Sequence, residues 1–159
     1  MNSDRQIARL LNEEHRGQLD LLGKVESALG SRKADDDLLR DLIKQLRRQV
    51  EHDVGRHFDF EEAELFTRMD ESGEGDIAGL LAEEHDAIRD VAEELLPLTA
   101  AALDGTLDAD GWDALRRTAL EMVERQVAHI QKEEMAMLPL LEDLLDEETD
   151  GRLAMEYAC

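Results

Sequence analysis

Histidine and glutamate side chains recur in this chain in a pattern that is written twice. Each copy is a lone histidine followed, after 42 residues in the first copy and 44 in the second, by a His-x-x-x-Glu motif; the members are His15, His57, Glu61, His85, His129 and Glu133. Imidazole and carboxylate groups are ligands that suit iron and related metals. A histidine and a glutamate four residues apart share one face of a helix. The pattern therefore predicts a two-metal site built from four helices.

The residues around these positions repeat as well. Leu-Leu-x-Glu-Glu-His occupies residues 10–15 and again residues 80–85, and a Glu-Glu pair ends the matching segments 57–62 and 129–134. The two halves of the chain are therefore expected to be two helix pairs related by a pseudo-two-fold rotation.

Four long segments that would carry these residues have apolar side chains at helical spacing, with short glycine- and aspartate-containing stretches between them. They cover about residues 3–29, 35–69, 76 onward to a connection at 104–111, and 112–145. Pro97 is expected to kink or end the third, because proline cannot donate a helical hydrogen bond. Short connections make neighbouring helices antiparallel, so we expect an all-α, up-down-up-down four-helix bundle over residues 1–145. Residues 146–159 are expected to be a tail or a short extra helix.

The six candidate ligands fall on the inward, apolar stripes of these segments. A buried carboxylate is costly unless it is neutralised, paired or bound to a metal ion, and no arginine or lysine occupies the inner positions of the second and fourth segments. A single histidine on an apolar stripe is more often an ordinary core residue, and an isolated His-x-x-x-Glu pair is commonly a surface pair. Six such groups, duplicated in register, favour metal binding instead.

Ferritin-like di-metal bundles use a different motif, in which a glutamate stands three residues before a histidine. The residues three positions before the five histidines of this chain are Asn12, Gln49, Val54, Ala82 and Gln126. None is acidic, which argues against that family.

Composition excludes several classes of function. The chain has 159 residues and a formal net charge of −22, from 40 acidic against 18 basic residues, so nucleic-acid binding is not expected. No basic cluster offers a membrane-binding patch, and the first thirty residues contain no apolar run typical of a signal peptide or a membrane span. The single cysteine, Cys159, is the last residue, which fits a reducing compartment. We therefore expect a cytoplasmic protein.

The order of the motifs resembles the hemerythrin-like, HHE cation-binding family over roughly residues 10–141. The resemblance implies a non-haem di-iron centre (Fe²⁺/Fe³⁺) with an oxo or hydroxo bridge. It implies terminal ligands at His15, His57, His85 and His129, and bridging carboxylates at Glu61 and Glu133.

Two positions depart from the oxygen-carrying members of that family. Arg89 stands where those proteins have a second histidine in the third helix, and Glu133 replaces a later aspartate. The chain is closer to the six-ligand branch, which includes nitric-oxide-reactive and iron–sulfur-repair proteins. Outside the motif, His52 is expected on the surface or near the ligands, while Glu14 and Glu84 either support the ligand histidines or form a solvated face.

The leading hypothesis for function is a di-iron protein that binds or reacts with a small ligand, namely O₂, NO or peroxide. Reversible binding and turnover as a peroxide- or NO-reactive oxidoreductase both stay open. Two alternatives are an iron donor or iron–sulfur-repair-type protein, whose partner would be an iron-acceptor or redox protein, and a metal-free helical interaction module.

Overall fold

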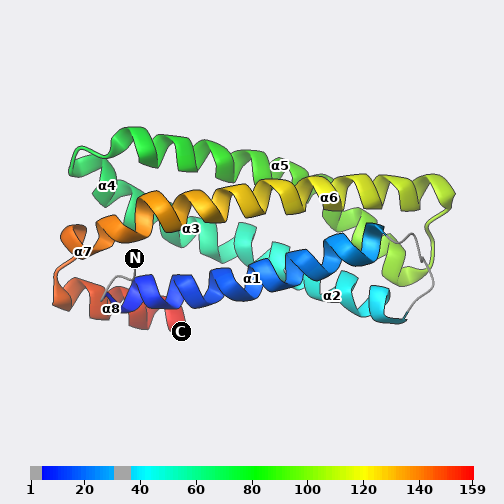
Figure 1. Ribbon diagram of the computed structural model, residues 1–159, viewed down its shortest axis with the longest axis horizontal. Coiled ribbons are helices and arrows are strands. Elements are labelled where there is room, and N and C mark those ends of the chain that lie inside the picture. The colour runs from blue at the N-terminus through cyan, green and yellow to red at the C-terminus, as the bar shows by residue number, and fades with distance from the viewer. Residues whose placement is uncertain (1–4, 31–36) are drawn as a thin grey trace.

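The computed structural model describes residues 5–30 and 37–159. These residues form five stretches of helix, which Figure 1 shows side by side. The first is α1 (Gln6–Gly30). The second is a continuous run of α2 (Asp37–His52), η1 (Asp53–His57), α3 (Phe58–Phe60), η2 (Glu61–Phe66) and α4 (Thr67–Glu71). The third is α5 (Gly75–Asp104). The fourth comprises α6 (Ala109–Lys132), η3 (Glu133–Met137), η4 (Leu138–Leu140) and α7 (Leu141–Leu144), and α8 (Glu147–Ala158) follows.

The first four stretches form a closed bundle. Helix α1 packs on α2 and α6, and α5 packs on the same two neighbours. Successive stretches run in opposite directions along the long axis (Figure 1). The described residues contain no strand. The predicted all-α, up-down-up-down four-helix bundle is confirmed.

Most predicted segments match these helices, with one clear difference. The predicted starts near Ser3 and Asp35 lie outside the described residues. The expectation that Pro97 could end the third segment is wrong, because α5 continues past it to Asp104. Beside the proline, Arg47 of α2 donates to the carbonyl oxygen of Leu96 at 3.0 Å, which ties this part of α5 to its neighbour.

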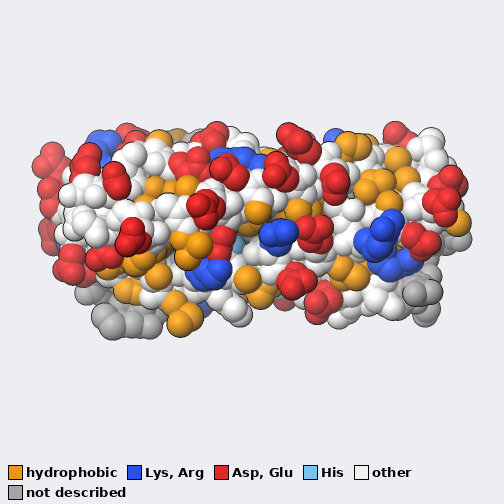
Figure 2. Space-filling view, turned by 90° about the horizontal axis from the view of Figure 1, so that it is seen from above, with side chains coloured by type: hydrophobic (Ala, Val, Ile, Leu, Met, Phe, Trp, Pro, Cys, Tyr) orange, Lys and Arg blue, Asp and Glu red, His pale blue; other side chains and the backbone are white. Residues whose placement is uncertain are grey.

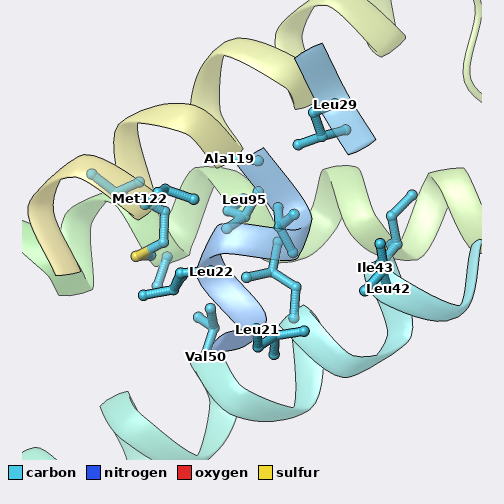
Figure 3. Close-up of a cluster of buried hydrophobic side chains, with 14 of the residues drawn as sticks. Leu21, Leu22, Leu29, Leu42, Ile43, Val50, Leu95, Ala119 and Met122 are labelled. Carbon is cyan, nitrogen blue, oxygen red and sulfur yellow. The ribbon is translucent and has the colours of Figure 1, made fainter. Parts of the chain in front are cut away.

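Two apolar clusters fill the bundle, one on each side of the six candidate ligands. The larger cluster includes Leu22, Leu46, Leu95, Ala119 and Met122 (Figure 3). The other lies toward the end where α8 packs and includes Ile7, Leu11, Leu65, Met69, Leu81 and Met137. Along α1 and α5, His15 and His85 come between residues of the two clusters. The candidate ligands therefore form a polar layer between the two apolar clusters.

Helix α8 packs against the beginning of α1. The carboxylate of Asp150 accepts hydrogen bonds from the backbone N–H groups of Gln6 (2.9 Å) and Ile7 (3.0 Å), which have no partner within their own helix. A side chain of α8 thus caps α1 from a distance of more than 140 residues in sequence. This contact fixes α8 beside the bundle.

The surface carries the acidic excess. Acidic side chains are spread over the whole face shown in Figure 2, with few basic side chains among them. Among the described residues, no helix has the length and apolar character needed to cross a membrane.

Candidate metal centre

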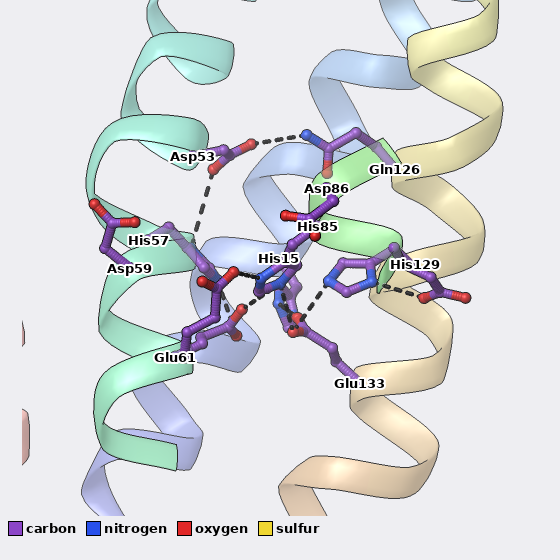
Figure 4. Close-up of polar contacts among 12 residues, drawn as sticks. His15, Asp53, His57, Asp59, Glu61, His85, Asp86, Gln126, His129 and Glu133 are labelled. Carbon is purple, nitrogen blue, oxygen red and sulfur yellow. Dashed lines mark hydrogen bonds and ion pairs between the residues drawn. The ribbon is translucent and has the colours of Figure 1, made fainter. Parts of the chain in front are cut away.

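All six predicted ligands converge in the middle of the bundle (Figure 4). Their ligating atoms form two groups, and the atoms of each lie within 4.8 Å of one another. One group contains His15 and His57, the other contains His85 and His129, and both contain Glu61 and Glu133. Every member is at most 2 % exposed. The structure thus brings the six side chains together in one buried cluster, and their role as metal ligands stays a prediction.

The two shared glutamates divide their oxygen atoms between the groups. Oε2 of Glu61 lies 3.1 Å from Nε2 of His57, and its Oε1 lies 3.1 Å from Nε2 of His85. Oε1 of Glu133 lies 3.1 Å from Nε2 of His15, and its Oε2 lies 3.1 Å from Nε2 of His129. Each carboxylate therefore presents one oxygen to each group, as a carboxylate that bridges two cations does.

Several of these inward atoms are buried polar atoms without a hydrogen-bond partner. They are Nε2 of His15, His85 and His129, both side-chain oxygens of Glu61, and Oε2 of Glu133. Buried polar atoms are nearly always hydrogen-bonded, and charged ones are paired or coordinate a metal. The donor set is histidine nitrogen and carboxylate oxygen, which suits a transition-metal ion. The residues present therefore fit a metal site.

On its outer side, each of the four imidazoles contacts another carboxylate through Nδ1. His15 contacts Glu134 at 3.2 Å and His85 contacts Glu62 at 2.7 Å. A carboxylate on Nδ1 keeps the proton there, so that Nε2 is free to bind a metal, and it also fixes the ring orientation.

The other two imidazoles follow the same rule with partners from the preceding helix of their own half. His57 contacts Glu14 at 3.2 Å, and His129 contacts Glu84 at 2.8 Å. Glu14 and Glu84, which the sequence left open between support and a solvated face, are thus the supporting carboxylates of the two His-x-x-x-Glu motifs.

Three segments of π-helix lie at the site. They are η1, which ends at His57, η2, which begins at Glu61, and η3, which begins at Glu133. A π-turn adds a residue to a helical turn and often marks a functional site. Sequence spacing predicted regular α-helix here, and it offered no signal for this change of register.

Charge pairing holds the cluster together when no cation is bound. Burial alone would lower the pKa of His15, but the carboxylates of Glu133 and Glu134 outweigh it and raise that pKa to about 9. Burial likewise opposes the rise in the pKa of His85, which Glu133 and Glu61 bring to about 9. Protonated imidazoles thus occupy the place of a cation between the two carboxylates.

The carboxylate of Glu133, which both groups share, shows the reverse effect. Burial alone would raise the pKa of Glu133, but the neighbouring His129, His15 and His85 hold it well below its usual range. Glu133 is therefore ionised at neutral pH, the state required of a metal ligand.

Aromatic rings cover His85 on the side where the third helix lacks a second histidine. Phe58 stacks on the imidazole of His85 with ring centres 3.8 Å apart, and Phe66 lies 5.2 Å away. Arg89 pairs with Glu62 at 2.9 Å and lies over the ring of Phe58. This arginine is engaged in ion pairs and does not reach toward the ligands.

Three supporting residues were not identified from the sequence. Glu62 and Glu134 follow the two bridging glutamates directly, and their repetition in both halves was the available signal. Tyr157 of α8 had no signal in the sequence; its hydroxyl donates to Glu14 and lies 3.0 Å from Nδ1 of His57. His52 also contacts Glu14, at 2.5 Å, so it lies near the site but outside the ligand set.

Comparison with known proteins supports the same reading of the site. No curated protein matches the chain. A family model described as the hemerythrin HHE cation-binding domain matches residues 6–141, which include all six converging side chains. The chain therefore belongs to the hemerythrin HHE cation-binding domain family, and its buried histidine and glutamate clusters suit a metal site.

Proposed function

We propose that this protein holds two iron ions between Glu61 and Glu133 and binds or reacts with a small ligand there, namely O₂, NO or peroxide. The observation that carries the proposal is that two donor groups share the same pair of buried carboxylates. His15 and His57 would hold one ion, and His85 and His129 the other. Each glutamate would bridge, because its two oxygens face different histidines.

Iron and zinc would behave differently with the donors that this site offers. Each ion would receive two imidazole nitrogens and two carboxylate oxygens, a total that closes a structural zinc site. Iron accepts further ligands at such sites, so coordination positions would stay open. Bound iron would supply those open positions and a change of oxidation state.

The chain's own residues would shape the environment of that chemistry. Phe58 and Phe66 exclude water on the His85 side, and the apolar clusters close the two ends of the polar layer. The carboxylates on Nδ1 keep the four imidazoles in one tautomer and orientation. Such dry surroundings suit a small uncharged ligand.

A second candidate function is the donation of iron to an acceptor protein. Glu84, which holds His129, also lines a surface groove of about 570 Å³ together with Glu83, Glu121 and Glu124. The carboxylates of this groove, which Arg125 and Lys132 also line, would give a divalent cation a place to dock beside Glu84. Transfer of iron to an acceptor without redox turnover would favour this candidate.

Elemental analysis of aerobically purified protein, together with its absorption spectrum, tests the proposal. We expect two irons per chain and the near-ultraviolet charge-transfer bands of a bridged ferric pair. Addition of NO or peroxide to the reduced protein under anaerobic conditions should then change the spectrum. One metal per chain, or two zinc ions without spectral change, would contradict the proposal.

Variants of the proposed ligands give the first prediction. His57→Ala and Glu133→Ala should each lose at least one iron per chain, because they remove a donor that has no replacement. His52→Ala is the matched control: it removes a histidine near the site that makes no contact with the ligating atoms, so it should keep both irons. Equal iron content in all three variants would show that the six residues are not the ligands.

A further inference from the structure

The two ligand groups have equivalent donors but different surroundings. On one side, the supporting carboxylate Glu14 contacts the hydroxyl of Tyr157, a residue that is 9 % exposed. On the other side, the equivalent Glu84 pairs with Lys132, whose side chain is 48 % exposed. The pseudo-two-fold repeat is therefore broken where α8 meets the site.

Tyr157 contacts both His57 and the carboxylate that supports it. Its hydroxyl donates to Glu14 and lies 3.0 Å from Nδ1 of His57, while Glu14 itself lies 3.2 Å from the same nitrogen. The phenol ring meets the imidazole edge-on, with ring centres 5.9 Å apart, and also packs against Phe60 at 4.7 Å. The ring of His57 is thus held by three contacts on its outer side.

Helix α8 is fastened to the bundle at both of its ends. Near its beginning, Asp150 accepts from the first backbone N–H groups of α1. Near its end, Arg56 donates to the carbonyl oxygens of Glu156 and Tyr157, and its guanidinium lies 5.3 Å from the centre of the tyrosine ring. These contacts hold Tyr157 in place over His57.

On the other side, the carboxylate that supports His129 has a surface lysine as its partner. Glu84 and Lys132 both line the groove of about 570 Å³ at the surface of α5 and α6, where Arg125 pairs with Glu121 at 2.9 Å. Separating a lysine that is half exposed from a carboxylate costs little, because surface ion pairs are weak. Glu84 is therefore held behind His129 less firmly than Glu14 is held behind His57, where Tyr157 contacts both residues.

We propose that Tyr157 is a positioning residue through which α8 slows the release of the metal ion held by His15 and His57. The ion held by His85 and His129 is then the one that exchanges faster. This inference rests on the two-metal function proposed above. It also gives a role to residues 147–158, which lie beyond the part of the chain that matches the family model.

Release of Fe²⁺ tests the proposal in the full-length protein. Metal-free protein is loaded anaerobically with Fe²⁺ and mixed with an excess of a chromogenic ferrous chelator. The wild type should release its iron in two phases of one ion each. Tyr157→Phe should accelerate the slow phase about 10-fold and leave the fast phase unchanged. Removing a hydrogen-bond partner of a metal ligand typically lowers metal affinity by about 10-fold to 100-fold, and the expected effect is the lower end of that range.

Two control variants separate this effect from a general loosening. Lys132→Met removes the partner of Glu84 and should leave the slow phase unchanged. Met155→Ala, at a position on α8 that is 72 % exposed, should leave both phases unchanged. A single release phase in the wild type, or a slow phase that is the same in Tyr157→Phe, would overturn the proposal; equal acceleration of both phases would do so too. Failure of the wild type to bind iron would instead refute the two-metal function.

A spectroscopic measurement guards against a folding defect in the variant. With Co²⁺ as a paramagnetic probe, the Nδ1 protons of the ligand imidazoles give strongly shifted, exchangeable proton resonances. Tyr157→Phe should move the resonance of one imidazole and leave the other three in place. A shift of all four would assign Tyr157 a merely structural role and overturn the proposal.

Discussion

At the scale of single residues, all four imidazoles are oriented alike: Nε2 faces inward, and Nδ1 contacts a carboxylate on the outer side. Glu14 and Glu84 support the histidine of the next helix in their own half, whereas Glu62 and Glu134 support the lone histidine of the other half. The four contacts thus obey the pseudo-two-fold repeat of the sequence. The two adjacent glutamates of each half therefore differ in position. The first faces inward, and the second contacts the imidazole of a histidine from the other half.

Removal of one outer carboxylate should weaken metal binding without unfolding the protein. Glu134→Gln takes away the negative charge behind His15, so the imidazole becomes a weaker ligand and is less well oriented. We expect a loss of about 10-fold to 100-fold in metal affinity, measured by competition with a chelator of known affinity. Glu83→Gln, an exposed acidic residue beside Glu84, should leave the affinity unchanged; equal losses in both variants would point to overall charge as the cause.

At the scale of elements, the second and fourth helical stretches change register where they carry ligands. The π-turns η2 and η3 begin at the bridging glutamates, and η1 ends at His57. The hydrogen-bond geometry of a π-turn is unfavourable by itself, so it persists only where packing or function demands it. The fold thus departs from regular helix at its ligand-bearing positions.

Pro97 is a second departure from regular helix, and its removal should stabilise the protein. It lies exposed inside α5, where a proline costs about 3 kcal/mol through a missing hydrogen bond and a steric clash. Part of the gain is offset, because alanine increases the conformational entropy of the unfolded chain and so lowers the free energy of unfolding by up to about 1 kcal/mol. Pro97→Ala should therefore raise the free energy of unfolding by about 2 kcal/mol, measured by urea denaturation of the metal-free protein.

The other proline of the chain provides the control. Pro139 lies where the π-turn η3 passes into the short helix η4, so the helix is already irregular at this position. Pro139→Ala should bring no stabilisation. A destabilised Pro97→Ala variant would show that α5 needs the proline for its packing against α2.

At the scale of the whole molecule, the metal-free protein should lose stability as the pH rises through weakly alkaline values. The pKa of His15 and that of His85 are about 9 in the folded state, above the ordinary value of 6.5. A raised pKa contributes stability that is fully present below about pH 6.5 and is lost as the pH approaches 9. The expected loss is on the order of a few kcal/mol.

The metal-loaded protein is the comparison for this pH dependence. Bound imidazoles are neutral, so the loaded protein should keep its stability over the same pH range, and metal uptake at pH 7 should release protons to solvent. Thermal unfolding of both forms at pH 6, 7.5 and 9, together with proton release in a weakly buffered solution, provides the measurement. A metal-free protein whose stability is flat or rises from pH 6 to 9 would contradict the assigned pKa shifts.

The amino-acid sequence alone determined the bundle and the six histidine and glutamate side chains that converge in it. Helical spacing of apolar residues, short connections and a motif written twice leave one arrangement in which His15, His57, His85 and His129 all face inward. Each of these signals is local or repetitive, so it can be found without coordinates.

Only the tertiary structure decided what surrounds those ligands. The π-turns leave no mark in residue spacing, because the balance between packing and backbone hydrogen bonds sets them. The contacts of Tyr157 with Glu14 and His57 join residues 143 and 100 positions apart in sequence, through a helix whose docking depends on Asp150 meeting the start of α1. The difference between the two halves of the site is therefore a property of long-range packing, which a repeated motif cannot reveal.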